Sequence, residues 1–124
     1  MHDATECGVL GGLYEMASHS GVGMNIRLDD IVLQHAVKGT CDCFGIDPYI
    51  AISEGTLLAT AKKEKAERIV EALKREDIPA SVVGEVVPKK DGIHILRKGR
   101  KEALSHPRLD PFWVKFEEYL KKQA

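Results

Sequence analysis

The 124-residue sequence lacks the features that mark several large classes of protein. No stretch approaches the roughly 18 consecutive apolar residues that a bilayer crossing needs, which argues against membrane insertion. The start has no basic segment followed by an apolar run and a cleavage site, so no secretory signal is predicted. We therefore expect a cytoplasmic protein without a membrane partner.

Cysteine is scarce and charge is balanced. Cys7, Cys41 and Cys43 are odd in number, and the last two are separated by one residue, so we expect free thiols rather than a disulfide framework. The sequence has 18 Lys and Arg residues and 19 Asp and Glu residues, which gives a net charge of −1. Because non-specific nucleic-acid binders carry a net positive field, we expect no nucleic-acid partner.

The patterns that are present predict one α+β domain. Apolar residues at three- and four-residue spacing predict helices, and alternating apolar residues predict strands. The predicted helices cover about residues 5–20, 31–44 with a break at Gly39, 62–78 and 112–120. The predicted strands cover about residues 24–28, 57–61, 81–87 and 92–99, the last two forming a hairpin. Since strict strand–helix–strand alternation is absent, an α+β arrangement is favoured over a doubly wound sheet.

The first predicted helix opens with groups suited to bind a phosphate or an activated carbonyl. A helix start offers backbone N–H groups, glycines such as Gly8 let a ligand approach, and His2 and Asp3 can exchange protons. Each glycine costs about 1 kcal/mol relative to alanine inside a helix, so close approach of backbone or ligand has to offset it. The same residues also fit a helix capped by Thr5 whose glycines pack against a strand.

A second candidate site is the stretch Ile-Ser-Glu-Gly-Thr. Glu54 precedes a predicted strand, a position from which its carboxylate can reach a ligand at the end of the sheet. The alternative is a turn in which Ser53 and Gly55 serve the backbone and Glu54 is solvated.

Two further patterns have weaker functional interpretations. Cysteines with His2, His19 or His35 could form a zinc site, but structural zinc uses C-x₂₋₄-C pairs and this chain has only Cys-Asp-Cys. We therefore expect no metal. The basic run at residues 88–101 could contact phosphate or RNA, but without aromatic residues to stack on bases it fits a solvated hairpin face better.

The opening stretch "MHDATECGVLGGLYEMA", followed some fifty residues later by "DPYIAISEGTLLATAKKEKAERIVEALKREDIPASVVGEV", resembles the C-terminal domain of the AIR-synthase-related, PurM-like superfamily. The archaeal AIR-synthase-related proteins and the hydrogenase maturation factors of the HypE type are the most similar branches. The resemblance implies a three-layer α+β fold with a mixed sheet. We expect a single domain over residues 1–124, in which residues 1–99 are the core of the resemblance and residues 100–124 are a C-terminal extension beyond it, ending in a closing helix.

The resemblance also implies a function. Members of the superfamily use ATP and Mg²⁺ held mainly by an N-terminal domain, which this chain lacks, and the C-terminal domain closes the cleft. The implied partners are that N-terminal ATP-binding domain, in cis or in trans, and a small-molecule or protein-carboxamide substrate. We expect the isolated domain to bind no cofactor and to be inactive. A small-ligand or partner-binding module without enzymatic activity is the alternative.

Site residues carry over from the resemblance position by position. His2 and Glu54 resemble the family's cleft-facing catalytic histidine and glutamate. Ligand or nucleotide contacts are implied for two turns, comprising Asp3, Thr5 and Gly8 in the first and Ser53, Gly55 and Thr56 in the second. The chain departs from the family pattern at Cys7, which replaces a glycine and predicts an exposed thiol near the site, and at its end, which lacks the terminal cysteine of HypE.

Overall fold

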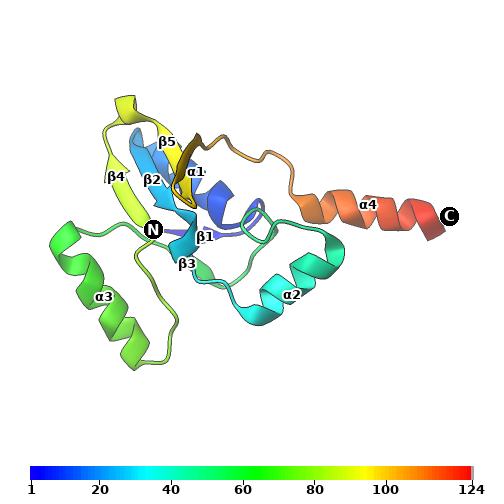
Figure 1. The fold of residues 1–124 in the computed structure, drawn as a ribbon, viewed down its shortest axis with the longest axis horizontal. Coiled ribbons are helices and arrows are strands. Elements are labelled where there is room, and N and C mark those ends of the chain that lie inside the picture. Colours follow the sequence, from blue (N-terminus) through cyan, green and yellow to red (C-terminus); the bar gives the residue numbers. More distant parts are fainter. Residues whose placement is uncertain (124) are drawn as a thin grey trace. The chain divides into compact units, whose positions relative to one another are not determined.

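A computed structural model describes residues 1–123 and shows an α+β fold, as predicted (Figure 1). Contacts divide the chain into two compact units. The first comprises residues 1–16, 33–58 and those from 105 onward, and the second comprises residues 17–32 and 59–104.

The first unit holds a two-stranded antiparallel sheet and three helical segments. Strand β1 (His2–Ala4) pairs with β3 (Thr56–Leu58). The helices are the start of α1 (Gly8–Ser20), α2 (His35–Phe44) and α4 (Pro111–Gln123). The buried hydrophobic residues of this unit come from the two strands, from α1 and from the segment before β3, and are Ala4, Cys7, Leu10, Leu13, Ala51 and Leu58.

The second unit is built on a four-stranded mixed sheet with the order β4-β2-β5-β6. The strands are β2 (Gly23–Arg27), β4 (Gly84–Val87), β5 (Ile93–Arg97) and β6 (Arg100–Ala103). The 3₁₀ turns η1 (Leu28–Asp30) and η2 (Lys89–Asp91) and the helix α3 (Lys63–Arg75) complete the unit. Alternation in β2 buries Met24 and Ile26.

The predicted hairpin of residues 81–87 and 92–99 is wrong. Strand β2 lies between β4 and β5, antiparallel to the first and parallel to the second. The hairpin partner of β5 is β6, which the sequence patterns did not predict. Lys98 and Gly99, both at positive φ, form the two-residue turn between them, because this left-handed conformation matches the twist of a hairpin.

The helices confirm the predicted periodicity and correct several of the predicted ends. Helix α1 begins at Gly8, so Thr5 is not its side-chain cap, and it ends before Gly21 at φ +64° as expected. Helix α2 runs through Gly39 without a break, because a single helical glycine costs only about 1 kcal/mol. Asp30, directly before the predicted start of the second helix, belongs to η1 and accepts a hydrogen bond from Arg27.

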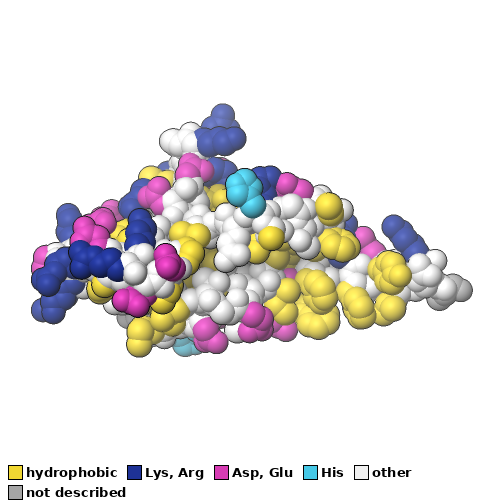
Figure 2. All heavy atoms as spheres, turned by 90° about the horizontal axis from the view of Figure 1, so that it is seen from below, with side chains coloured by type: hydrophobic (Ala, Val, Ile, Leu, Met, Phe, Trp, Pro, Cys, Tyr) yellow, Lys and Arg dark blue, Asp and Glu magenta, His cyan; other side chains and the backbone are white. Residues whose placement is uncertain are grey.

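The last helix forms as predicted but does not close over a core. Pro111 stands at its first position, where proline's missing N–H costs nothing. No described residue of α4 is buried, and Figure 2 shows hydrophobic side chains gathered over it. Phe112, Trp113 and Phe116 contact one another on its surface. The helix therefore presents an exposed aromatic face.

Candidate functional site

The two predicted turns meet in the first unit. Strands β1 and β3 pair so that His2 lies opposite Leu58 and Ala4 lies opposite Thr56. Beyond the strands, the backbone N–H of Ser53 donates a hydrogen bond of 3.0 Å to the carbonyl of Thr5. The structure thus brings the His2–Thr5 segment and the Ser53–Thr56 segment side by side, although they are distant in sequence.

The second turn is held by its own side chains. The Ser53 hydroxyl lies 3.1 Å from the Thr56 hydroxyl, and Gly55 adopts φ +73° between them. Glu54 is exposed, as are Asp3 and Thr5 in the first turn. The strand register sets Leu58 rather than Glu54 opposite His2, so the two predicted catalytic residues start from different ends of the paired segment.

The start of α1 is shaped by backbone packing. Cys7 and Gly8 are consecutive left-handed residues, both at φ 60°. A Cβ atom at Gly8 would lie 2.6 Å from the Ala51 carbonyl oxygen and 2.8 Å from that of Tyr49. This close approach of backbone offsets the cost of a glycine at the helix start.

Three backbone N–H groups at this helix start already donate within the chain. That of Gly8 donates to the Thr5 carbonyl at 3.1 Å, and that of Leu10 donates to the Tyr49 carbonyl at 3.0 Å. The N–H of Cys7 donates to the Asp110 carboxylate at 2.7 Å. The helix dipole thus faces an anion supplied by the protein itself.

Asp110 is a residue that the sequence patterns did not single out. Its side chain is buried, with 2% of the residue exposed. One carboxylate oxygen accepts from Cys7, 103 residues earlier, and the other accepts from the N–H of Phe112 at 2.9 Å, which caps α4. Asp110 therefore fastens the C-terminal segment to the turn that begins α1.

His2 and the unpredicted Glu15 form a short polar contact in the site. The His2 Nε2 atom lies 2.7 Å from a Glu15 carboxylate oxygen, and His106 Nε2 lies 3.2 Å from the other oxygen. The hydrogen bond from His2 is the main reason that the pKa of Glu15 lies below its usual value, and His106 adds to the effect while partial burial opposes it.

This lowered pKa has a defined consequence for stability. Because the folded pKa of Glu15 is below its unfolded value, the carboxylate stabilises the fold above the unfolded pKa. The contribution is lost as the pH falls through the folded pKa of Glu15.

Cys7 does not match its prediction. The residue is 4% exposed, so its thiol does not stand free beside the site. Burial raises the pKa of the Cys7 thiol, and the nearby carboxylates of Asp110, Glu6 and Glu15 raise it further. The departure from glycine is tolerated because Cys7 packs into the core, although it holds a left-handed φ.

We expect the thiols of Cys7 and Cys43 to differ sharply in reactivity. With iodoacetamide at pH 8, native Cys43, which is exposed, reacts at least about ten-fold faster than Cys7, because alkylation needs an accessible thiolate. Peptide mass spectrometry at timed intervals measures both rates, and labelling in urea provides the control in which they converge. Equal rates in the native protein would contradict the burial of Cys7.

Two broader features can be stated for residues 1–123. No three or more of their His, Cys, Asp and Glu side chains are grouped so as to hold a metal ion. No helix formed by these residues has the length and apolar character needed to cross a membrane.

Comparison with known proteins places this geometry in a family. Residues 1–97 match the family described as AIR synthase related protein, C-terminal domain. A putative hydrogenase expression/formation protein of Methanocaldococcus jannaschii is 34% identical over 97 residues, which cover 77% of this chain and 29% of that protein. Carbamoyl dehydratase HypE of Escherichia coli is 30% identical over 114 residues, or 90% of this chain and 34% of that protein.

Solved structures of HypE proteins are also similar to this chain. The crystal structure of E. coli HypE matches with a TM-score of 0.76 and 31% identity, covering 88% of this chain and 34% of that one. A HypE–HypF complex matches with a TM-score of 0.71 and 30% identity, over 85% of this chain and 35% of that one. The chain therefore spans about a third of these relatives, and it belongs to the AIR synthase related protein family as a C-terminal domain.

Proposed function

We propose that the chain is the cleft-closing half of a HypE-like, ATP-dependent enzyme. The single observation that carries the proposal is the pairing of β1 with β3, which sets the His2–Thr5 and Ser53–Thr56 segments side by side. The family match supports it, because it spans both segments. The name of the E. coli relative, carbamoyl dehydratase, suggests a carboxamide substrate, either a small molecule or a group on a protein.

In this proposal the two segments have different roles. His2 and Glu54 act on the reacting carboxamide, since an imidazole and a carboxylate can each accept or return a proton near neutral pH. The exposed side chains of Asp3 and Thr5 and the half-buried side chains of Ser53 and Thr56, with the backbone at Gly55, contact the ligand, while Gly8 gives the first turn its shape.

ATP and Mg²⁺ belong to the other half of the enzyme. The chain's own residues do not fit these groups, because the described N–H groups of Cys7, Gly8 and Leu10 are engaged by protein acceptors. Among residues 1–123 there is also no grouped set of carboxylates for a metal ion. An N-terminal domain, in cis or in trans, completes the enzyme, and the isolated chain has no turnover.

We expect the proposed catalytic pair to be essential in the assembled two-domain protein. His2→Ala and Glu54→Gln each lower kcat for substrate-dependent ATP hydrolysis by about 100-fold or more, the usual effect of removing a general acid or base. Release of ADP is followed by a coupled assay, with circular dichroism to check the fold. His35→Gln, on exposed α2, is the matched control and keeps full activity. Full activity of both site variants would refute the assignment.

A binding module is the second candidate, favoured by one observation. Helix α4 exposes Phe112, Trp113, Phe116, Tyr119 and Leu120, an aromatic and aliphatic surface suited to protein contact. The size of the native polypeptide in the source cells separates the candidates, using an antibody against this chain. A band of two-domain length supports the enzyme in cis. A band of this chain's length supports the module if the chain also shows no turnover when it is mixed with a separate ATP-binding domain.

A further inference from the structure

Two imidazole rings contact one carboxylate in the first unit, and one of them comes from outside the family match. His2 lies on β1, Glu15 on α1, and His106 on the loop between residues 104 and 110. His106 is 91 residues from Glu15 in sequence and lies beyond residue 97, where the match to the family ends.

Glycines of α1 lie beside both rings, although the tightest neighbours of an added Cβ would be Cys7 at Gly11 and Leu58 at Gly12. Gly11 and Gly12 precede Glu15 by four and three residues, so all three lie on neighbouring positions of one helix face. A Cβ atom at Gly12 would lie 3.6 Å from the His2 ring, and one at Gly11 would lie 3.9 Å from His106 Nε2. Each imidazole thus lies beside one glycine as it reaches Glu15.

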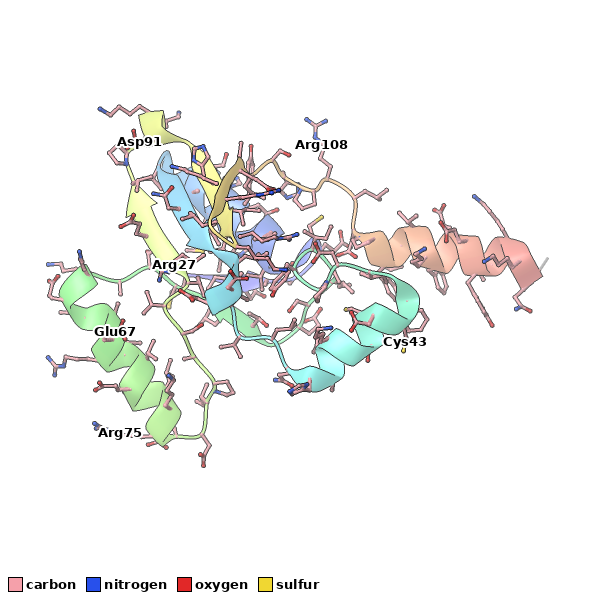
Figure 3. The ribbon with its side chains drawn as sticks, viewed as in Figure 1. Arg27, Cys43, Glu67, Arg75, Asp91 and Arg108 are labelled. Atoms are coloured by element: carbon pink, nitrogen blue, oxygen red, sulfur yellow. The ribbon has the colours of Figure 1, made fainter. Side chains whose placement is uncertain are left out.

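The partners of His106 fix its protonation state. Its Nδ1 atom accepts a hydrogen bond of 2.9 Å from the backbone N–H of Arg108, so Nδ1 carries no proton. The Nε2 atom must then be the N–H group, and it donates to Glu15. Arg108 holds φ 65° and, in Figure 3, extends its side chain outward from the loop, so its contribution is made by its backbone. The Tyr14 ring packs edge-on against the His106 ring, with 5.5 Å between the ring centroids.

The same reasoning assigns His2. Glu15 is ionised at neutral pH, as a glutamate in contact with two imidazole nitrogens is expected to be. An ionised carboxylate only accepts, so the short contact requires the proton on His2 Nε2. In the neutral ring, the lone pair is then on Nδ1. That atom lies 3.7 Å from the Asp3 carboxylate, beyond hydrogen-bonding distance, and the His2 side chain is 32% exposed.

We propose that His106 is a positioning residue that acts through Glu15 to hold His2 as the Nε2–H tautomer, with Nδ1 presented as the proton acceptor of the site. The use of that acceptor in catalysis rests on the proposed function; the tautomer does not. When a substrate N–H gives its proton to Nδ1, the N–H bond breaks, its electron pair stays on the substrate nitrogen, and a new N–H bond forms on the ring. The Glu15 carboxylate then neutralises the imidazolium.

Other polar and titratable groups lie near these three side chains. Asp3 faces His2 Nδ1, Tyr14 faces His106, and the Cys7 thiol is close enough to Glu15 for the carboxylate to raise its pKa. His2 and His106 contact different oxygens of the Glu15 carboxylate. These two contacts are the geometry from which the tautomer of His2 is assigned.

Long-range ¹H–¹⁵N spectra of the ¹⁵N-labelled chain at neutral pH test the proposal without substrate. His2 and His106 are expected as single Nε2–H tautomers, with Nδ1 unprotonated in both. In His106→Ala, His2 is expected to lose this signature and show both tautomers, and His106→Gln, whose amide can donate to Glu15, is expected to restore it. His35→Gln, on exposed α2, is the control and leaves His2 unchanged.

Two results would overturn the proposal. One is a wild-type His2 with the proton on Nδ1 or with mixed tautomers, which decides the matter even if a variant fails to fold. The other is an unchanged His2 tautomer in a folded His106→Ala variant. A normal tautomer pattern combined with a two-domain enzyme that keeps full activity in His2→Ala would instead reject the proposed function and leave the positioning intact.

Discussion

Replacement of Gly8 by alanine is expected to lower the free energy of unfolding by about 4 kcal/mol or more, a range that only strongly disruptive substitutions reach. Two penalties combine. A left-handed φ of 60° costs a non-glycine residue about 1–2 kcal/mol. The new Cβ would also lie 2.6 Å from the Ala51 carbonyl oxygen and 2.8 Å from that of Tyr49. Neither contact can be relieved by turning a side chain, so the backbone itself has to move.

Gly21→Ala is the matched control for this prediction. Gly21 has nearly the same backbone conformation, φ 64°, but no atom lies within 4 Å of an added Cβ. It should therefore show the conformational penalty alone, about 1–2 kcal/mol. Urea unfolding followed by circular dichroism measures both variants. Equal losses in the two would mean that the backbone packing around Gly8 adds nothing to stability.

The sequence predicted the local elements better than their pairing. The 3.6-residue spacing of Leu10, Leu13 and Ala17 indicated α1, and these residues are buried. Strand pairing depends instead on contacts between distant segments, so nothing in residues 81–99 showed that β2 would lie between β4 and β5. Strand β1, three residues long, is too short to show a period and exists because β3 pairs with it.

The site was predicted only in part, for a related reason. The polar turns around Thr5 and Ser53 stood out in the sequence, and the structure brings them together. Glu15 had the pattern of a solvated position on a helix. His106 and Asp110 lay in a loop without periodicity, and their partners are 91 and 103 residues away. The adjacent pair Gly11 and Gly12 was the one available signal, because glycines inside a helix indicate that something packs closely on it.

Asp110 links the turn at the start of α1 to the C-terminal segment, so its replacement should destabilise both. In Asp110→Ala the Cys7 N–H remains buried without its acceptor, which costs about 1–3 kcal/mol. Helix α4 also loses its cap, which costs about 1 kcal/mol. The expected total loss in the free energy of unfolding is about 2–4 kcal/mol. The stability of Asp110→Asn should lie between that of Asp110→Ala and wild type, because one amide oxygen can replace only one of the two acceptor oxygens.

Asp29→Ala is the control that isolates burial in the Asp110 prediction. The Asp29 carboxylate also accepts from a backbone N–H, that of Lys98 at 3.3 Å, but the contact is exposed to solvent. Water can replace it, so the expected loss is within about 0.5 kcal/mol. Urea unfolding gives the free energies, and amide exchange at Cys7 shows whether its N–H has lost protection. Similar losses for the two alanine variants, with Cys7 still protected, would show that Asp110 does not hold the turn at α1. A large loss confined to Asp110 would instead mean that a residue outside the family match, at position 110, has become part of the structure on which His2 and Glu15 depend.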